Sequence, residues 1–390
     1  MVGVLQDVLA GQLDEMVRET AVLAAIDSAS HDPAGVDRVA DGMASLLADR
    51  GFHIARMPLA GRGHQMAARL ELGDGPTVLV LGHADTVWER GWSVRQEGGL
   101  LYGPGVGDMK GCVVMAAHAI DAARRHGLHG LGAIEVLLVP DEELGSPGSR
   151  AWIEERARGA DACLGLEAGW PGGGVVVSRG AVGALRVLAH GRAAHCAGHE
   201  DDGASALTAI APLVAALQGH SRPDDGVRVT AGVLRAGTAR QVIPAEAELH
   251  IDLRAPDAAA AEALMAGLRA EVAAVDAPGV RIELDGGFTR PAFEADRSAA
   301  LFALAAPRAA ELGIPLRPVH ARGGSDASFA AALGVPTLDG LGPICHDSCA
   351  PDERIEIASL AERGALLAAL LLDVAAQARE PASGNVDAPA

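Results

Sequence analysis

The sequence predicts an α/β protein with a mainly parallel sheet, into which a smaller α+β domain is inserted. In the first half and again near the end, short β-branched and Leu-rich runs alternate with amphipathic helical patterns. Between about residues 180 and 290 the pattern changes to strands accompanied by two helices, which is typical of an antiparallel sheet. We therefore expect a main domain in two parts, residues 1–179 and 291–379, an insert at 180–290 and a disordered tail at 380–390.

Composition narrows the class of protein. The chain has 390 residues, 49% of them hydrophobic and 21% charged, which predicts a soluble globular protein with room for two domains. The net charge of −19 argues against a nucleic-acid or anionic-membrane partner. The five cysteines are scattered and form no CxxC motif, so we expect reduced thiols and a cytoplasmic location. No signal peptide and no membrane span are expected, because no apolar run reaches about 18 residues.

The first part is expected to alternate helices with buried strands. Each strand is a short apolar run bounded by turn-forming residues, and Pro33 stands near the start of the second helix. A glycine-rich loop at 102–111 leads into the third helix. The expected helices are residues 5–26, 33–50, 112–125 and 149–157, and the expected strands are 77–81, 134–139 and 162–166.

The insert and the last part follow from the same kinds of pattern, and no internal repeat is visible. In the insert, the expected strands are residues 184–190, 227–234, 246–253 and 280–284, and the expected helices are 204–217 and 258–275. After residue 290, the expected elements are helix 299–312, a short helix after Asp326, strand 335–338 and helix 357–377.

Acidic side chains gather where the strand 134–139 ends, in the sequence Pro-Asp-Glu-Glu of residues 140–143. Burying an ionised carboxylate without a partner is very unfavourable, so a cation is expected there. The alternative is a solvated acidic turn before a helix. In a parallel sheet, ligands gather at the carboxyl ends of the strands, where His83 and Glu167 also fall.

Imidazoles and carboxylates on loops after predicted strands form a candidate metal site. Such nitrogen and oxygen donors suit zinc, or less often cobalt or manganese. Five donors would crowd one ion but divide naturally between two ions about 3.5 Å apart that share a carboxylate. Taken singly, each is a weak indication, since a strand-end histidine is more often structural. The candidate ligands are His83, Asp108, Glu143, Glu167 and His346.

Two further acids fit supporting roles in such a site. Asp85 follows His83 by two residues on an extended segment, so it could accept the second ring N–H of that histidine. Glu142 adjoins Glu143 and can remain unligated, free to take a proton from an attacking water.

Motifs in a fixed order resemble the zinc-dependent aminoacylase/carboxypeptidase superfamily. The resemblance covers residues of about 5 to 375 and is strongest to glutamate carboxypeptidases of the carboxypeptidase-G type, with acetylornithine and succinyl-diaminopimelate deacylases as cousins. It implies that the two-part main domain is catalytic and that the insert is a dimerisation or lid domain, so a homodimer is expected. The motifs are GHADTV, YGPGVGDMKG, VPDEELGSPGSR, LGLEAG, GRAAHCAG, VIPAEAELHIDLR and GGSDASFAA, followed by a late His346.

The resemblance assigns roles to the metal-site residues and implies two Zn²⁺ ions as cofactors. It implies Asp108 as the bridging ligand, followed by a cis peptide bond to Met109. One zinc would be held by His83 and Glu167 and the other by Glu143 and His346, with Glu142 as general base and Asp85 supporting His83.

Substrate contacts are also implied. His195 matches a histidine that reaches the partner's active site and stabilises an oxyanion. Arg254 and Arg290 match arginines that hold the substrate carboxylate, although Arg290 could instead form a structural ion pair at the domain junction. The loop containing Gly324 and Ser325 resembles one that meets the substrate backbone. Where relatives usually have Asn, this chain has Gln241, one methylene longer, so the specificity pocket is expected to be shifted.

The function expected from the resemblance is di-zinc hydrolysis of an amide bond next to an amino acid with a free carboxylate. The substrate would be a small N-acyl amino acid or a dipeptide-like molecule, and release of glutamate is the first expectation. The scarcity of aromatic residues, 3%, gives no support to a folate substrate. The alternatives are an N-acyl-amino-acid deacylase, a metal-poor binding relative and an aminopeptidase-like cousin. All five ligands and the base are present, which counts against the second of these.

Overall fold

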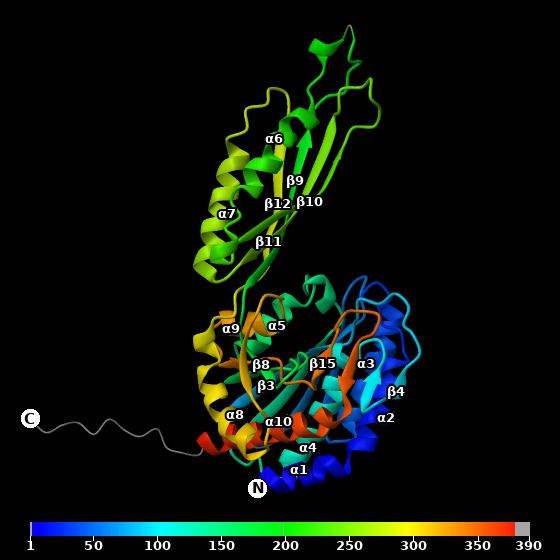
Figure 1. Ribbon diagram of the computed structural model, residues 1–390, viewed down its shortest axis with the longest axis vertical. Coiled ribbons are helices and arrows are strands. Elements are labelled where there is room, and N and C mark those ends of the chain that lie inside the picture. The colour runs from blue at the N-terminus through cyan, green and yellow to red at the C-terminus, as the bar shows by residue number, and fades with distance from the viewer. Residues whose placement is uncertain (1, 198, 379–390) are drawn as a thin grey trace, which may run out of the picture. The chain divides into compact units, whose positions relative to one another are not determined.

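The structure is a computed structural model that describes residues 2–197 and 199–378 (Figure 1). The chain divides into two compact units. Unit 1 comprises Met1–Ser178, Glu294–His320 and Ser325–Ala390, and unit 2 comprises Arg179–Phe293 and Ala321–Gly324. The predicted tail lies outside the described residues. The predicted domain boundaries and the roles expected for the domains remain predictions.

Unit 1 is built on a six-stranded, mainly parallel sheet. Its order is β1-β2-β6-β3-β7-β14, in which β6, β3, β7 and β14 run parallel and β1 and β2 are antiparallel additions at one side. The predicted parallel sheet is therefore confirmed. The strands are β1 (His53–Pro58), β2 (His64–Glu71), β3 (Thr77–His83), β6 (Ala133–Val139), β7 (Ala162–Gly165) and β14 (Thr337–Leu338).

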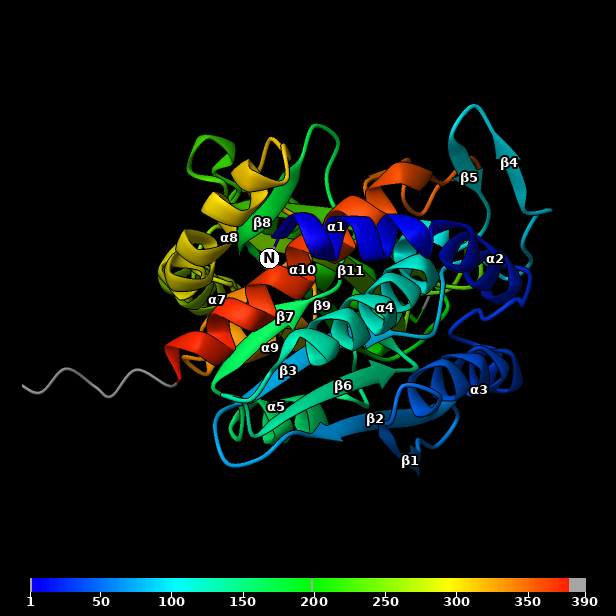
Figure 2. The ribbon, with the colours of Figure 1, turned by 90° about the horizontal axis from the view of Figure 1, so that it is seen from below.

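Helices cover both faces of this sheet. Successive side chains of a strand point to opposite faces, so Val78 and Val80 belong to one hydrophobic core and Leu79 and Leu81 to another. The first core is shared with α1, α2, α3, α4, α8 and α10, and the second with α5 and α9; α1, α4 and α10 lie together in Figure 2. The helices are α1 (Val2–Gly11), α2 (Leu13–Ala24), α3 (Pro33–Ala48), α4 (Gly111–His126), α5 (Arg150–Ala157), α8 (Ala299–Glu311), α9 (Ala327–Ala332) and α10 (Ile357–Gln377).

Two smaller sheets are formed by strands that lie wholly or mostly in unit 1. One has the order β15-β16-β5-β4 and brings the segment around His346 next to the loop after Tyr102. The other pairs β8 with β13. The strands are β4 (Arg95–Glu97), β5 (Leu100–Tyr102), β8 (Gly174–Arg179), β13 (Arg317–Ala321), β15 (Cys345–His346) and β16 (Arg354–Glu356).

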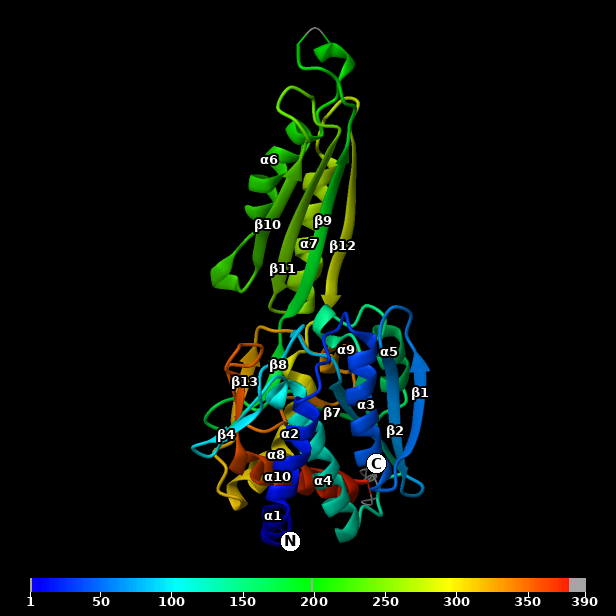
Figure 3. The ribbon, with the colours of Figure 1, turned by 90° about the vertical axis from the view of Figure 1, so that its right-hand side faces the viewer.

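Unit 2 is a four-stranded antiparallel sheet with two helices, as predicted for the insert (Figure 3). The order is β10-β11-β9-β12. Along β9, Leu185, Val187 and Ala189 are buried with α6 and α7, whereas Ala184 and Arg186 are exposed. The elements are β9 (Ala181–His190), α6 (Ala206–Gln218), β10 (Arg228–Ala236), β11 (Glu246–Ala255), α7 (Ala258–Ala273) and β12 (Arg281–Arg290).

Across residues 2–197 and 199–378, no helix combines the length and the apolar character that crossing a membrane requires.

Candidate metal centre

His83 ends β3 and is almost fully buried, with 1% of its surface exposed. Its Nε2 lies 3.0 Å from Oδ1 of Asp108, and its Nδ1 lies 2.9 Å from the backbone oxygen of Asp85 and 3.4 Å from Oδ1 of that residue. Burial alone would lower the pKa of His83, but hydrogen bonds with Asp108 and Asp85 and nearby carboxylate charges hold the pKa well above its ordinary value. The imidazole is therefore fixed between two acidic residues.

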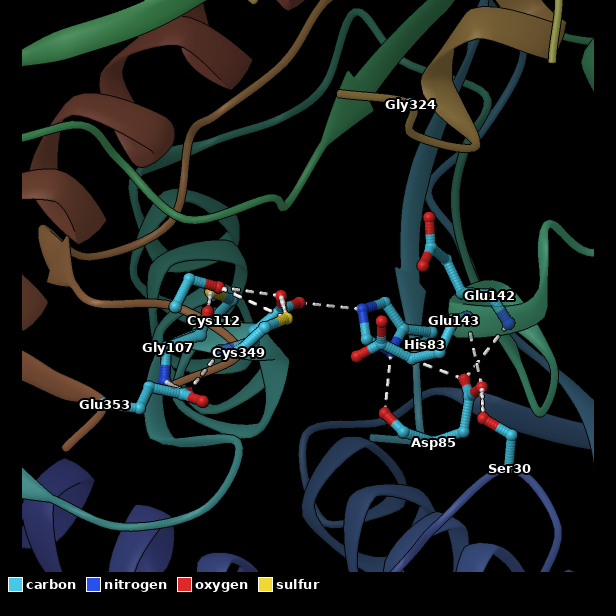
Figure 4. Close-up of polar contacts among 12 residues, drawn as sticks. Ser30, His83, Asp85, Gly107, Cys112, Glu142, Glu143, Gly324, Cys349 and Glu353 are labelled. Atoms are coloured by element: carbon cyan, nitrogen blue, oxygen red, sulfur yellow. Dashed lines mark hydrogen bonds and ion pairs between the residues drawn. The ribbon is translucent and has the colours of Figure 1, made fainter. Parts of the chain in front are cut away.

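Asp85 ties the His83 strand to the acidic turn. Its buried carboxylate accepts hydrogen bonds from Ser30 Oγ at 2.7 Å and from the backbone N–H groups of Glu142 and Glu143 at 3.1 and 3.2 Å (Figure 4). The sequence predicted that Asp85 would support His83. In the structure the nearest acceptor for the ring is the Asp85 backbone oxygen, and its carboxylate also orients the 142–143 turn.

Asp108 lies in the irregular turn η1 (Val106–Lys110), and the cis peptide bond to Met109 that the resemblance implied is present. While Oδ1 faces His83, Oδ2 accepts hydrogen bonds from Ser348 Oγ at 2.9 Å and from Cys349 Sγ at 3.3 Å. Burial opposes ionisation of Asp108, but these partners, led by His83, lower its pKa to about 2. A charged carboxylate is therefore present between the imidazole and the 348–349 turn.

Glu142 and Glu143 begin the short turn η2 (Glu142–Leu144), directly after β6. Glu142 is buried, with 8% of its surface exposed. Oε1 of Glu143 is buried and has no hydrogen-bond partner among the described residues. Burial, followed by the charge of Asp108, raises the pKa of Glu143 to about 10. A carboxylate in this position needs a cation to be charged at neutral pH.

The donor set fits a divalent metal ion. His83, Asp108 and Glu143 each offer one ligand atom, and these atoms lie within 4.8 Å of one another. Imidazole and carboxylate donors suit zinc and related ions. A cation among them would satisfy the buried oxygen of Glu143 and offset the crowding of negative charge. His83 and Glu143 follow the carboxyl ends of β3 and β6, where ligands gather in parallel sheets.

The other two predicted ligands lie outside this three-residue group within the part of the chain that the structure describes. Glu167 follows β7 and is half-buried; its charge is one of those that raise the pKa of the buried Cys112 thiol, after burial itself and Asp108. His346 ends β15, and its Nε2 lies 2.8 Å from Oε1 of Glu356. The assignment of all five residues as ligands remains a prediction.

The predicted substrate contacts in unit 2 have local partners. His195 is exposed, and its Nδ1 lies 3.1 Å from the backbone nitrogen of Ala197. Arg254 forms a bidentate ion pair with Asp252: its Nε lies 2.9 Å from Oδ1 and its Nη2 lies 2.9 Å from Oδ2. Gln241 is exposed, and its backbone oxygen accepts a hydrogen bond from Cys196.

Arg290 is buried, with 7% of its surface exposed, and lies against Gly324, where an added Cβ would be 2.6 Å from Cδ of the arginine. Nη1 of Arg179 donates to the backbone oxygen of Gly323 at 3.1 Å. In unit 1, Ser325 is buried, and its Oγ accepts the N–H of Ala327 at 3.1 Å. The contact of Arg179 could not be predicted, because nothing in SRGAVG indicates a contact with a glycine far along the chain.

A buried imidazole–carboxylate group at the ends of parallel strands is a site for a metal-dependent hydrolase. Residues 79–373 match Peptidase family M20/M25/M40, and the chain belongs to this family. It is a metal-dependent peptidase or amidohydrolase.

Two curated relatives match most of the chain. It is 28% identical over 380 residues to carboxypeptidase G2 of Pseudomonas sp. (strain RS-16), covering 93% of this chain and 89% of that protein. It is 30% identical over 345 residues to succinyl-diaminopimelate desuccinylase of Methylorubrum populi, covering 82% and 88%.

Solved structures share the fold. Aminopeptidase PepT from Bacillus cereus ATCC 10987 has a TM-score of 0.76 at 21% identity, covering 93% of this chain and 99% of that chain. The M20 family metallo-carboxypeptidase Sso-CP2 from Sulfolobus solfataricus has a TM-score of 0.71 at 14% identity, covering 92% and 98%.

Proposed function

We propose that this protein hydrolyses the amide bond next to an amino acid with a free carboxylate, as a C-terminal exopeptidase of the glutamate carboxypeptidase kind. The observation that carries the chemistry is the unsatisfied, buried Oε1 of Glu143 beside His83 and Asp108. The substrate class is supported by the similarity to carboxypeptidase G2. We further propose a cytoplasmic homodimer, following the resemblance noted from the sequence.

Two Zn²⁺ ions would be held by the five predicted ligands, with Co²⁺ or Mn²⁺ as possible substitutes. Asp108 would bridge them, His83 and Glu167 would hold one, and Glu143 and His346 the other. When bound, the ions would supply Lewis-acid polarisation of the amide carbonyl and acidify the attacking water.

The proton transfers belong to Glu142. Its carboxylate would take the proton from the attacking water and return it to the nitrogen of the leaving amine. The hydrogen bonds from the Glu142 and Glu143 N–H groups to Asp85 hold that turn in place. His195 would donate a hydrogen bond to the developing oxyanion, and Arg290 with Arg254 would hold the substrate carboxylate. Gly324 and Ser325 would meet the substrate backbone, and Gln241 would line the carboxylate pocket.

The substitution Glu142→Gln tests this function. We expect the variant to keep its metal content and to lose at least about 100-fold in turnover, because general base catalysis contributes about that much. Glu155→Gln, an exposed position on α5, is the matched control and should behave as the wild type. Metal analysis and the release of amine from dipeptides and N-acyl amino acids are the measurements. Unchanged turnover in Glu142→Gln would contradict the proposal.

A second candidate, an N-acyl-amino-acid deacylase, is favoured by the match to succinyl-diaminopimelate desuccinylase. The two candidates differ in substrate rather than in chemistry. Preferential cleavage of dipeptides and acyl-glutamates favours the carboxypeptidase, and preferential cleavage of N-acetyl or N-succinyl diamino acids favours the deacylase.

A further inference from the structure

Glu353 is a buried carboxylate that contacts the backbone of the turn carrying Asp108. Only 1% of its surface is exposed. Its Oε1 accepts hydrogen bonds from the N–H of Gly107 at 2.9 Å and from the N–H of Asp108 at 3.0 Å (Figure 4). Two consecutive peptide groups are thus held by one oxygen.

The backbone of Glu353 is anchored in turn. Its oxygen accepts the N–H of Gly103 at 3.2 Å, and its N–H donates to the oxygen of Ala350 at 3.0 Å. The next residue, Arg354, pairs with Tyr102 in the small antiparallel sheet. The backbone of Glu353 is therefore fixed to the segment that leads into the Asp108 turn and to the turn between β15 and β16, and this places its carboxylate.

The turn that carries Asp108 ends in a buried lysine. Lys110 is also 1% exposed, and its Nζ donates to the backbone oxygen of Ile26 at 2.8 Å. Burial lowers the pKa of Lys110 to about 8, and the charges of Glu353 and Asp27 oppose that shift. Burial, followed by the charge of Asp108, raises the pKa of Glu353 to about 7, and the hydrogen bonds from Gly107 and Asp108 oppose that shift.

We propose that Glu353 is a positioning residue for the metal centre, which fixes the backbone of Asp108 so that the carboxylate of Asp108 faces His83. An aspartate side chain is short, so the location of its carboxylate follows closely from the location of its own peptide group. Asp108 must present Oδ1 to His83 while Oδ2 faces Ser348 and Cys349, and a shift of its backbone would disturb both contacts. This inference rests on the proposed role of Asp108 as a metal ligand.

Gly107 supports the same interpretation. A Cβ added at Gly107 would overlap the side chain of Cys345 and come within 3.1 Å of Ile355. Gly107 therefore lies directly against β15 and β16, and Glu353 immediately precedes β16. Because Gly107 has no side chain, its backbone can lie close to these residues, and Oε1 of Glu353 reaches the N–H groups of both Gly107 and Asp108.

Simple stabilisation of the fold is the competing explanation. The same N–H groups stand just before α4, where a carboxylate can act as a cap without affecting the metal. The two explanations differ in metal affinity. A cap would change the stability of the protein but not the affinity for the metal, whereas a positioning residue would change the affinity.

The test uses the full chain, stripped of metal with a chelator and titrated with Zn²⁺ against a chelating dye. Glu353→Gln keeps an oxygen that can accept both N–H groups, Glu353→Asp keeps the charge but withdraws it by one methylene, and Glu353→Ala removes the acceptor. Visible absorption of the Co²⁺-loaded protein reports on the ligand geometry, and thermal unfolding of the metal-free protein reports on stability. Ser298→Ala is the control, because it removes a buried hydroxyl that donates its hydrogen to the backbone oxygen of Val177 or Ala295 in unit 1.

We expect Glu353→Gln to bind Zn²⁺ within about threefold of the wild type, and Glu353→Asp and Glu353→Ala to bind about 10- to 100-fold more weakly, as for other residues that orient metal ligands. Ser298→Ala should lose stability and keep the wild-type affinity. Wild-type affinity in Glu353→Ala would overturn the inference, as would Glu353→Asp binding as tightly as Glu353→Gln. That second comparison decides the matter even if Glu353→Ala does not fold. Failure of the wild type to bind any metal would instead overturn the proposed function.

Discussion

At the scale of one residue, the burial of the Glu143 carboxylate is unfavourable without a bound cation and would be favourable with one. Its Oε1 is buried without a partner among the described residues, and the neighbouring carboxylate of Asp108 adds repulsion. A buried polar group without a hydrogen bond costs about 1–3 kcal/mol, and a buried charge costs more. The protein keeps this unfavourable group in a position where a cation would satisfy it.

The substitution Glu143→Gln should therefore separate folding from metal binding. We expect the metal-free variant to melt no lower than the metal-free wild type, because the substitution removes a buried acid beside Asp108. Stabilisation by added Zn²⁺ should fall by about 2.7 kcal/mol if the affinity falls 100-fold. Thermal unfolding with Zn²⁺ and with a chelator measures both quantities. A variant that is less stable without metal, yet gains as much from Zn²⁺, would contradict this account.

At the residue scale, the sequence could offer a prediction only where the signal was local. His83, Asp85 and the 142–143 turn all follow buried strands directly, so the ends of β3 and β6 could be recognised from their apolar runs. Ser30 and Glu353 carry no such signal, because their partners are 55 and 245 residues away along the chain and neither adjoins a motif. Ser30 and Glu353 reach the site only when the chain has folded.

At the scale of elements, His118 joins α4 to neighbouring helical segments. This buried side chain of α4 places Nδ1 2.9 Å from Oε1 of Gln12, between α1 and α2. Its Nε2 lies 2.7 Å from Oε2 of Glu19 and 2.8 Å from Nη2 of Arg50. Burial lowers the pKa of His118 below 6.5 and Arg50 adds to this, while Glu19 and Glu15 oppose the shift without reversing it.

This geometry predicts a loss of stability in mild acid. When the folded state has the lower pKa, the unfolded state binds more protons, so stability rises with pH. The contribution of His118 is thus fully present above pH 6.5 and is lost as the pH falls through the folded pKa. We expect the free energy of unfolding, measured by urea titration in a chelator between pH 8 and 5, to fall less steeply in His118→Gln. His129→Gln, at an exposed histidine, is the control. Equal slopes in wild type and His118→Gln would rule out this role.

The elements themselves were predictable to different degrees. The buried parallel strands were found because both of their faces are apolar, and α10 was predicted with the limits Ile357–Gln377 that it has. The strand β1 was missed, since it is mostly exposed and its sequence HIARMP alternates poorly. The strand β12 was predicted only to residue 284, because Gly286 and Gly287 weaken the strand signal although pairing continues to Arg290.

At the scale of the whole molecule, the chain is organised as two units with separate cores. The core of unit 2 is formed by its own sheet and by α6 and α7, and all strands of that sheet lie within Arg179–Phe293. By contrast, every predicted metal ligand belongs to unit 1. Sequence patterns could place the change of architecture near residues 180 and 290, since the alternation of helix and strand stops there and resumes. They could not show that Ala321–Gly324 joins unit 2, because this contact depends on backbone hydrogen bonds such as that from Gly180 to Ala321.

A fragment of residues 179–293 should therefore fold alone, and its thermal stability should not depend on the metal. It retains the central strand β9, which pairs with both β11 and β12, and it loses only the short 321–324 segment of the unit. We expect one cooperative thermal transition, followed by circular dichroism, that does not move when a chelator replaces Zn²⁺. The full chain should melt at a lower temperature in the chelator, because ligand binding to the folded state adds to stability. A fragment that starts at residue 191 lacks β9 and should not fold, since removal of the central strand leaves β12 without a partner. If the 179–293 fragment shows no cooperative transition, unit 2 depends on the rest of the chain, and its core is insufficient by itself.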